Sequence, residues 1–177
     1  ATVANSVTSI IVTPTVDDAT ASVTVNGTLV ASGQASTAIS LAPGANTINV
    51  VVTAQDGTTT KSYTVTVTRQ AASSNANLSA LSLSSGSLSP TFASATTAYN
   101  ATVANSVTSI IVTPTVDEAT ATITVNGTSV ISGQATNAIA LSVGSNTINV
   151  VVTAEDGTTT KSYTVSVTRE ASSNANL

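Results

Sequence analysis

The sequence predicts an all-β protein built as tandem immunoglobulin-like Greek-key β-sandwiches, and three observations support this fold class. Threonine, valine, serine and alanine dominate the chain, while charged residues make up only 7%. This composition favours strands because β-branched side chains fit a pleated sheet. Apolar and polar residues alternate with period two in several stretches, which Gly, Pro and Asn-Gly breakers separate. The first seventy residues then recur in the second half of the chain.

The internal repeat sets the expected domain boundaries. Residues 101–170 align with residues 1–70 without a gap, and 14 of these 70 positions differ. Residues 75–100 have no counterpart ahead of the first copy, so we expect that copy to lack its opening strands. Residues 174–177 repeat the sequence of residues 75–78. The predicted organisation is an incomplete module at 1–70, a linker at 71–77, a complete module at 78–170, and a linker with the start of a further repeat at 171–177.

The complete module is predicted to contain about seven short strands with turn signals roughly every 8–12 residues. This pattern is typical of an immunoglobulin-like sandwich. The Asp-Gly pair within Glu155–Thr158 predicts a tight turn that makes the last two strands antiparallel neighbours. The expected strands are Ala80–Leu83, Ala98–Val103, Val107–Thr113, Thr120–Val125, Ser129–Ile131, Ala138–Leu141, Asn146–Ala154 and Lys161–Arg169. The expected breakers are Ser85-Gly86, Pro90, Pro114, Asn126-Gly127, Ser132-Gly133 and Gly144.

The predicted core is light in aromatic residues. It must consist mainly of Val, Ile, Leu and Ala, because the chain has no Trp or Met. We therefore expect each module to be stable by about a few kcal/mol. The four aromatic residues expected in the core are Tyr63, Phe92, Tyr99 and Tyr163. Alternation predicts buried faces formed by Tyr99, Ala101 and Val103, by Ile148, Val150, Val152 and Ala154, and by Tyr163, Val165 and Val167.

Composition also limits the partners and the compartment. The net charge is −4, and the cations are Lys61, Arg69, Lys161 and Arg169. We expect no nucleic-acid partner, because no basic patch is present to displace phosphate counterions. Without Cys the chain has neither a disulfide framework nor a thiolate metal site. We expect no membrane insertion, since no run of about 18 apolar residues occurs. We interpret the chain, which starts at Ala1 and has no signal segment, as a processed protein or part of a longer one.

A series of motifs in the complete module resembles one known family. These motifs are Leu-x-x-Leu-x-Leu-Ser-x-Gly-x-Leu-x-Pro-x-Phe at 78–92, Thr-Thr-x-Tyr at 96–99, Val-Asn-Gly at 125–127, Leu-x-x-Gly-x-Asn-Thr-Ile-x-Val at 141–150, Val-Thr-Ala-Glu-Asp-Gly at 152–157 and Tyr-Thr-Val-x-Val-Thr-Arg at 163–169. The pattern resembles the bacterial cadherin-like β-sandwich domain over 78–169 and, without its first strands, over 1–69.

The resemblance implies an immunoglobulin-like sandwich that recurs in large secreted or cell-surface proteins as a spacer, stalk or adhesive module. It implies no catalytic residues. It does not imply calcium, because the Asp-rich linkers of true cadherins have no counterpart at Arg69–Asn75.

Enzymatic chemistry has little support in the residues themselves. The chain has no His and no Cys, so the usual pairs of general base and nucleophile are absent. Asp117 and Glu118, like Asp17 and Asp18 in the first copy, are adjacent at the end of an expected strand. Adjacent strand residues point to opposite faces, whereas the two carboxylates of a glycosidase face each other across the bond. We therefore assign no catalytic residue, no cofactor and no metal site.

Two loop features leave alternatives open. Glu155-Asp156-Gly157 could offer two carboxylates to calcium, but the tripeptide also suffices as a turn, and the first copy has Gln55 at this position. Thr158–Thr160 could accept O-glycans, although a solvated strand start is the favoured interpretation. Asn-x-Ser/Thr sequons begin at Asn26, Asn77, Asn100 and Asn126, and we interpret them as products of composition, with Asn126-Gly127 as a hairpin turn. The neighbouring charged side chains of Arg169 and Glu170 are expected to lie at the surface in contact with water.

The predicted function is that of a non-enzymatic structural repeat in a bacterial extracellular or cell-surface protein, as a rigid stalk, spacer or fibre-forming segment. One alternative is a filament subunit in which the first copy is completed by a strand from another chain. A second is an adhesive or carbohydrate-binding module, although such modules usually expose aromatic residues for stacking. The expected partners are neighbouring copies of the module and, for the adhesive alternative, a cell-surface or matrix ligand.

Overall fold

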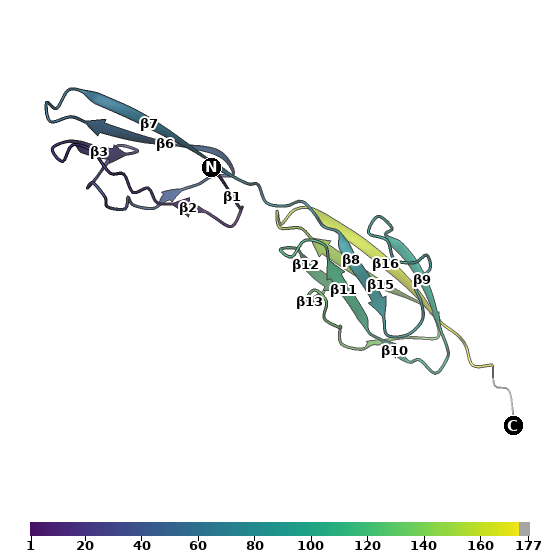
Figure 1. Ribbon diagram of the computed structural model, residues 1–177. Coiled ribbons are helices and arrows are strands. Elements are labelled where there is room, and N and C mark those ends of the chain that lie inside the picture. Colours follow the sequence, from purple (N-terminus) through teal and green to yellow (C-terminus); the bar gives the residue numbers. More distant parts are fainter. Residues whose placement is uncertain (174–177) are drawn as a thin grey trace. The chain divides into compact units, whose positions relative to one another are not determined.

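The computed structural model describes residues 1–173 and divides into two units, Ala1–Ala72 (unit 1) and a second that begins at Ser73 (unit 2). Every regular element of the described residues is a β-strand (Figure 1). The prediction of tandem all-β sandwiches is therefore confirmed. Within the described residues no helix has the length and hydropathy that a membrane crossing needs. The further repeat expected to start at residues 174–177 lies outside the described part of the chain.

The larger sheet of unit 2 has five strands in the order β13-β12-β15-β16-β9. Strands β15 and β16 pair antiparallel over ten residues each, from Gly144 opposite Arg169 to Thr153 opposite Thr160. Strand β9 runs parallel to β16, with Tyr99 opposite Val165. The strands are β9 (Ala98–Val103), β12 (Thr122–Val125), β13 (Thr128–Val130), β15 (Gly144–Thr153) and β16 (Thr160–Arg169). The predicted antiparallel pairing of the last two strands is confirmed.

Two short ladders supply the remaining strands of unit 2. Strand β8 (Leu78–Leu83) pairs antiparallel with β11 (Val112–Val116), and β10 (Ser109–Ile110) pairs with β14 (Ile139–Ala140). Buried residues from the large sheet and from both ladders form one cluster of twenty. The core of unit 2 therefore lies between the five-stranded sheet and these ladders.

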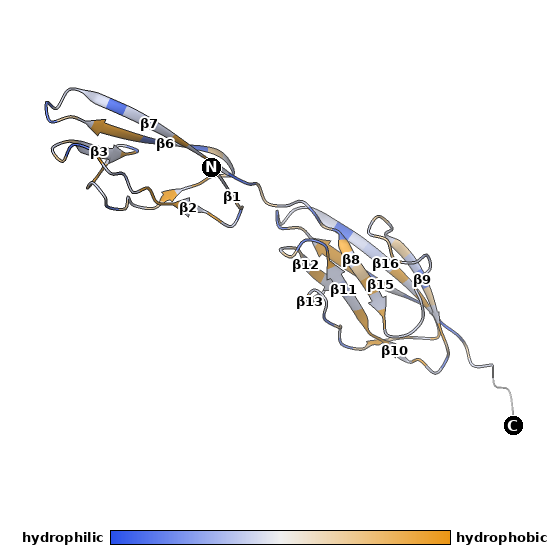
Figure 2. Ribbon diagram, viewed as in Figure 1, coloured by the Kyte–Doolittle hydropathy of each residue, from blue (hydrophilic) through white to orange (hydrophobic). Residues whose placement is uncertain are grey.

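Side-chain alternation in unit 2 follows the pattern expected for a sandwich with one buried face per strand. Tyr163, Val165 and Val167 on β16 are fully buried, as are Ile148, Val150 and Val152 on β15. Strand β9, which pairs with β16, also buries one face, formed by Tyr99, Ala101 and Val103. Figure 2 shows hydrophobic stretches, in orange, on several strands of unit 2. The predicted buried faces of the complete module are confirmed.

Two expected breakers lie inside strands. Pro114 is a buried residue of β11 opposite Leu81, and Gly144 begins β15 with φ 93°. Pro114 fits because its carbonyl accepts the Gly133 amide at 2.8 Å. The N and C=O of one strand residue point to the same side, so the missing N–H of Pro114 faces away from β8. The strand expected at Val107–Thr113 is divided into β10 and β11, which pair with different partners.

Unit 1 repeats the large sheet with the same register but has no counterpart of β8 and β11. Its sheet order is β4-β3-β6-β7-β1, and β2 pairs with β5. Residues 11–16 form no strand, and the core cluster has seven buried residues against twenty in unit 2. The strands are β1 (Thr2–Val3), β2 (Ser9–Ile10), β3 (Ser22–Val25), β4 (Thr28–Val30), β5 (Ile39–Ser40), β6 (Gly44–Thr53) and β7 (Thr60–Arg69). The first copy thus lacks its opening strands, as predicted.

Candidate functional site

Unit 1 has an open groove of about 590 Å³ where unit 2 holds a strand. One side of the groove is formed by residues 12–18, and the other by β6 and β7. Its lining is mostly apolar and includes Val12, Val16, Val52 and Tyr63. We call this feature the unit 1 groove.

Two side chains of β7 are exposed although their counterparts on β16 are buried. Tyr63 is 48% exposed and Val65 is 40% exposed, whereas their counterparts Tyr163 and Val165 are at 0%. The expectation that Tyr63 lies in the core is therefore wrong. The local sequence is the same in both copies, Thr-Lys-Ser-Tyr-Thr-Val, so the difference arises from what covers the strand and not from the strand itself.

Strand β8 and the residues that follow it, up to Tyr99 on β9, cover the equivalent surface in unit 2. Leu78 and Leu81 are buried there, and Leu81 lies opposite Pro114 in the ladder. The Leu78 amide donates a hydrogen bond to the Tyr163 hydroxyl at 3.0 Å, and that hydroxyl donates to the Ser94 carbonyl at 3.0 Å. Tyr163 is thus satisfied as both donor and acceptor in the core.

The other aromatic residues of unit 2 confirm the sequence prediction of a core position. Tyr99 is buried, and its ring lies 5.9 Å from that of Phe92. The Phe92 ring lies 6.4 Å from that of Tyr163 and packs, partly buried, against the core. The Tyr99 hydroxyl donates toward the carbonyls of Ala93 and Thr96, each at 2.8 Å. Tyr99 and Tyr163 are therefore not platforms for stacking a sugar.

Carboxylates at the turns cap the backbone. Asp156 accepts hydrogen bonds from the Thr158 and Thr159 amides and from the Thr159 hydroxyl, at 2.9, 2.7 and 2.6 Å. These bonds, led by that of the Thr159 hydroxyl, lower the pKa of Asp156 to about 2. Glu155 accepts the Ser73 amide at 2.7 Å. The turn function proposed for Glu155-Asp156-Gly157 is thus present, and the described residues contain no group of three or more His, Cys, Asp or Glu that could hold a metal.

Asp117 and Glu118, the two acidic residues after β11, also make structural contacts. The Asp117 carboxylate accepts the Asn75 side-chain amide at 2.8 Å, and its backbone amide donates to the Asn77 carbonyl at 2.9 Å. The Glu118 carbonyl accepts the Ala121 amide at 3.0 Å. These contacts fasten residues 75–77 to unit 2 and close the turn after β11.

The sequon asparagines have mostly internal contacts. Asn26 and Asn126 each adopt φ 48°, and the Asn126 side chain accepts the Asn149 amide at 2.9 Å. Because Gly127 follows with φ 79°, the pair has the two positive φ values of a type I′ hairpin turn, as predicted. The Asn77 side chain accepts the Lys161 ammonium at 2.8 Å. Asn100 is exposed on β9 and pairs through its backbone with Ser89.

Arg169 has a structural contact that the sequence analysis missed. Its guanidinium donates to the Asn105 carbonyl at 2.8 Å and to the Leu141 carbonyl at 2.9 Å. Arg69 makes the same two bonds in unit 1, to Asn5 and Leu41. The recurrence of Arg at the end of both copies was the available signal. The Arg169 side chain, which the sequence analysis expected to be only hydrated at the surface, instead joins the end of β16 to two loops through hydrogen bonds.

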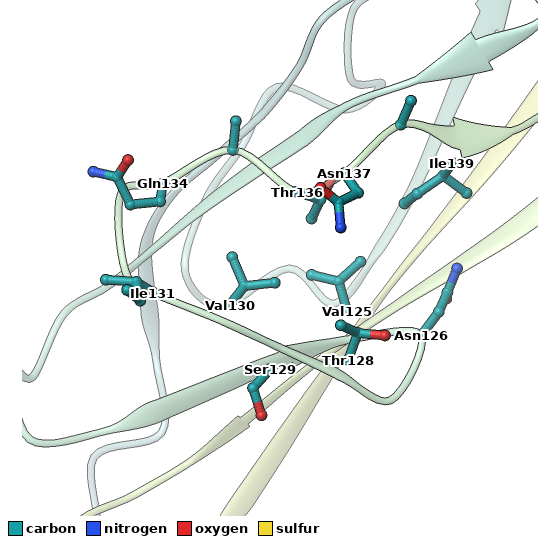
Figure 3. Close-up of a pocket in the computed structure, with 12 residues that line it drawn as sticks. Val125, Asn126, Thr128, Ser129, Val130, Ile131, Gln134, Thr136, Asn137 and Ile139 are labelled. Carbon is teal, nitrogen blue, oxygen red and sulfur yellow. The ribbon is translucent and has the colours of Figure 1, made fainter.

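A hollow of about 420 Å³ lies in unit 2 between the β12–β13 hairpin and residues 134–139. Figure 3 shows Val125, Val130, Thr136 and Ile139 around it, with Ile131 at its rim. None of its lining residues is charged or aromatic. The hollow therefore supplies neither an acid-base pair nor a stacking surface.

The chain enters and leaves unit 2 at opposite ends of β16. It enters at Ser73, whose carbonyl accepts the Asp156 amide at 3.1 Å, in the turn before β16. It leaves after Arg169, the last residue of β16. Residues 73–77, expected within the 71–77 linker, contact unit 2 through these and the Asp117 bonds. The points at which the chain enters and leaves unit 2 are therefore separated by the length of β16.

Comparison with known proteins agrees with this topology. The profile of the cadherin-like beta sandwich domain matches residues 1–70 and again residues 78–170. The chain belongs to this family. Two tandem cadherin-like domains are thus present, and the first lacks its opening strands. The family is one of β-sandwich domains and indicates no catalytic activity.

One curated relative is a protein of Evansella cellulosilytica named "Putative membrane protein", 42% identical over 106 residues. The match covers 60% of this chain and 16% of that protein's length. The matched part of the chain therefore spans about a sixth of that relative's length.

The solved structures to which the chain is similar are remote. They include fibronectin(III)-like modules of Clostridium thermocellum CbhA (TM-score 0.29, 14% identity, covering 93% of this chain and 85% of that chain). They also include domains 4 and 5 of the S-layer protein SbsC (TM-score 0.32, 20% identity, covering 85% and 70%). These scores are too low to bear on function.

Proposed function

We propose that this cadherin-like chain is a non-enzymatic spacer segment of an extracellular or cell-surface protein. The observation that carries the proposal is that the chain enters unit 2 beside Asp156 and leaves after Arg169, at opposite ends of β16. A module with this geometry extends a tandem array by its own length.

The length added per unit follows from β16. This strand has ten residues, and strands rise about 3.3 Å per residue, so each unit adds roughly 33 Å. Both ends of the strand are fixed within unit 2. Ser73 is bonded to the Glu155 carboxylate at 2.7 Å, and the Arg169 guanidinium is bonded to the Asn105 and Leu141 carbonyls. These contacts keep the entering and leaving chain in place under tension.

The chemistry of the surface supports a mechanical role over a catalytic one. The acidic side chains at the turns cap backbone amides, as Asp56 and Asp156 do with the threonines that follow them. The hollow beside β13 has no charged side chain. The name of the Evansella relative, "Putative membrane protein", supports a location at the cell envelope.

Small-angle X-ray scattering on chains with added modules tests the spacer function. We would compare the chain with variants in which one and two further copies of residues 71–170 follow Glu170. The expected result is an increase of the maximum dimension of roughly 30–40 Å per added copy. An unchanged maximum dimension, which would mean that the units fold back on one another, would refute the proposal. A glycan-binding screen on the same chains tests the adhesive alternative, and binding by either unit would favour it.

A further inference from the structure

We propose that the parallel pair of β9 and β16, closed at one end by Arg169 and Asn105, is the element of unit 2 that resists pulling on the chain. This role deepens the proposed spacer function, on which it rests, because a spacer is loaded through its two ends. Its test applies force to unit 2 alone. The force test and the scattering test of the spacer function can therefore fail independently.

The load path through unit 2 follows from where the chain enters and leaves. Pulling on the entering chain acts first on Leu78 at the start of β8 and, once β8 has left, on Ala98 at the start of β9. Pulling on the leaving chain acts on Arg169 at the end of β16. Strands β9 and β16 lie side by side and parallel (Figure 1), with Val103 opposite Arg169. The two pulls therefore slide these strands in opposite directions along their length.

Sliding loads the hydrogen bonds of the pair together. The ladder joins the six residues of β9 to β16. The Thr164 amide donates to the Thr97 carbonyl at 2.8 Å at one end, and the Glu170 amide donates to the Val103 carbonyl at 3.0 Å at the other. Bonds between parallel strands are evenly spaced, so all of them are stretched by the same displacement. Strands that are peeled apart lose one bond at a time and resist less.

Burial adds to the resistance of the pair. Sliding would draw the buried side chains of Tyr99, Ala101 and Val103 out of the core, which costs free energy as apolar surface meets water. Strand β9 is the edge of its sheet, and within the described residues its other side carries one isolated bridge, between Asn100 and Ser89. The backbone of β9 is therefore held almost entirely by β16.

Reciprocal hydrogen bonds close the end of the pair at which the leaving chain is pulled. The Arg169 guanidinium donates to the Asn105 carbonyl at 2.8 Å, and the Asn105 side-chain amide donates to the Glu170 carbonyl at 2.9 Å. A second guanidinium bond reaches the Leu141 carbonyl at 2.9 Å. We call Arg169, Asn105 and Glu170 the strand-end lock. Its bonds must break before Arg169 moves along the strand axis.

The strand-end lock has a counterpart in unit 1. The Arg69 guanidinium donates to the Asn5 carbonyl at 2.8 Å, and the Asn5 side-chain amide donates to the Gln70 carbonyl at 3.0 Å. Gln70 stands where unit 2 has Glu170. The exchange leaves the lock intact, because only the backbone carbonyl of this residue takes part in it. Each unit of this chain therefore carries its own lock.

A different set of contacts fastens the entering chain. The Lys161 ammonium donates to the Asn77 side chain at 2.8 Å and to the Ser94 carbonyl at 2.7 Å. Lys161 lies outside the residue pairs that join β16 to β9. The contacts of the entering chain and those of the β9–β16 pair are therefore loaded one after the other, and separate substitutions can weaken them.

Single-molecule pulling at constant force tests the load path. The chain has no Cys, so Ser74→Cys at an exposed position supplies a unique attachment point before unit 2, and a tag after Leu177 supplies the other. We expect two steps. The first should release residues 78–97, roughly 60–70 Å of contour length, and the second residues 98–169, roughly 230 Å. A single step would overturn the proposal, because β8 would then hold more strongly than the β9–β16 pair.

A second pulling direction separates geometry from stability. Ser145→Cys, also exposed, and the same tag load the neighbouring ends of β15 and β16, since Ser145 lies opposite Thr168. This direction peels β16 away one residue at a time. Forced unfolding is governed by the unfolding rate, and at the same force we expect it to be at least about a hundredfold faster than the second step above. Equal rates in the two directions would overturn the proposal.

Two variants in the Ser74→Cys chain weaken one step each. Asn105→Ala removes the bond to the Glu170 carbonyl and should accelerate the second step roughly three- to tenfold, with the first unchanged. Lys161→Met removes both ammonium bonds and should accelerate the first step at least about tenfold, with the second unchanged. Asn5→Ala is the matched control, because it opens the lock of unit 1 outside the force path. If Asn105→Ala leaves the second step as slow as Asn5→Ala does, the lock bears no load and the proposal fails.

Discussion

The backbone amide of Leu78 donates a hydrogen bond to the hydroxyl of Tyr163 at 3.0 Å, across 85 residues of sequence. This bond joins the opening strand of unit 2 to the last strand of its large sheet, in a buried setting. Tyr63, the counterpart in unit 1, is 48% exposed, and its hydroxyl has no such partner among the residues that the structure describes. The two units therefore provide matched variants and controls in one chain.

Removing the Tyr163 hydroxyl should destabilise unit 2 selectively. In Tyr163→Phe the buried Leu78 amide loses its acceptor, whereas the Ser94 carbonyl keeps the Lys161 ammonium at 2.7 Å. We expect the free energy of unfolding of unit 2 to fall by about 1–3 kcal/mol. Tyr63→Phe is the control and should change unit 1 by less than about 0.5 kcal/mol. Urea unfolding followed by NMR signals of each unit measures both, and equal losses would contradict the structure.

Truncating the neighbouring valines should show the same asymmetry. Val165 is fully buried and Val65 is 40% exposed. Val165→Ala leaves a cavity in a packed core, and we expect a loss of about 2 kcal/mol in unit 2. Val65→Ala should cost under about 1 kcal/mol in unit 1, because much of its surface already contacts water. The midpoints of denaturant unfolding for the two units give both values. A larger effect at Val65 than at Val165 would mean that unit 1 is covered in solution.

The arginine contacts should behave alike in both units. Arg169 and Arg69 each donate to two loop carbonyls at 2.8–3.0 Å. Replacing either one by Lys keeps the charge but loses the planar pair of donors, so we expect a loss of about 1–2 kcal/mol in the unit that carries it. Thermal unfolding of the single variants and of the double variant measures these losses. Additive losses are expected, since the two sites belong to different units.

Acid should weaken both units through the β-turn aspartates. The Thr159 hydroxyl and the Thr158 and Thr159 amides lower the pKa of Asp156 from 3.8 to about 2, and Asp56 has the same arrangement and about the same pKa. A lowered pKa means that the unfolded chain takes up the proton first. The stabilisation is therefore complete above about pH 4 and is lost as the pH falls toward 2.

Unfolding midpoints measured between pH 7 and pH 2 test this dependence. The Asp56→Asn and Asp156→Asn double variant keeps an acceptor oxygen but has no titrating group. Its stability should be lower at pH 7 and should fall less steeply below pH 4. A slope identical to that of the unchanged chain would assign the acid sensitivity to other carboxylates.

The sequence alone determined the repeat, the tight turns and most of the strands. Alternation in Tyr163, Val165 and Val167 predicted which side chains of β16 are buried, because successive strand residues point to opposite faces. The Asn126-Gly127 pair predicted its hairpin turn, because only a few residue types tolerate positive φ. These features depend on neighbours in sequence, which the sequence displays directly.

Only the tertiary structure decided what covers each strand. Residues 60–65 and 160–165 have the same sequence, yet Tyr63 is exposed and Tyr163 is buried. The burial of Tyr163 depends on a segment that begins 85 residues earlier, at Leu78. Pro114 likewise fits into strand β11 because its nitrogen, which has no hydrogen to donate, faces Gly133 and not β8. Local pattern fixes the direction of a side chain, whereas its burial depends on whether a distant segment is there to pack against it.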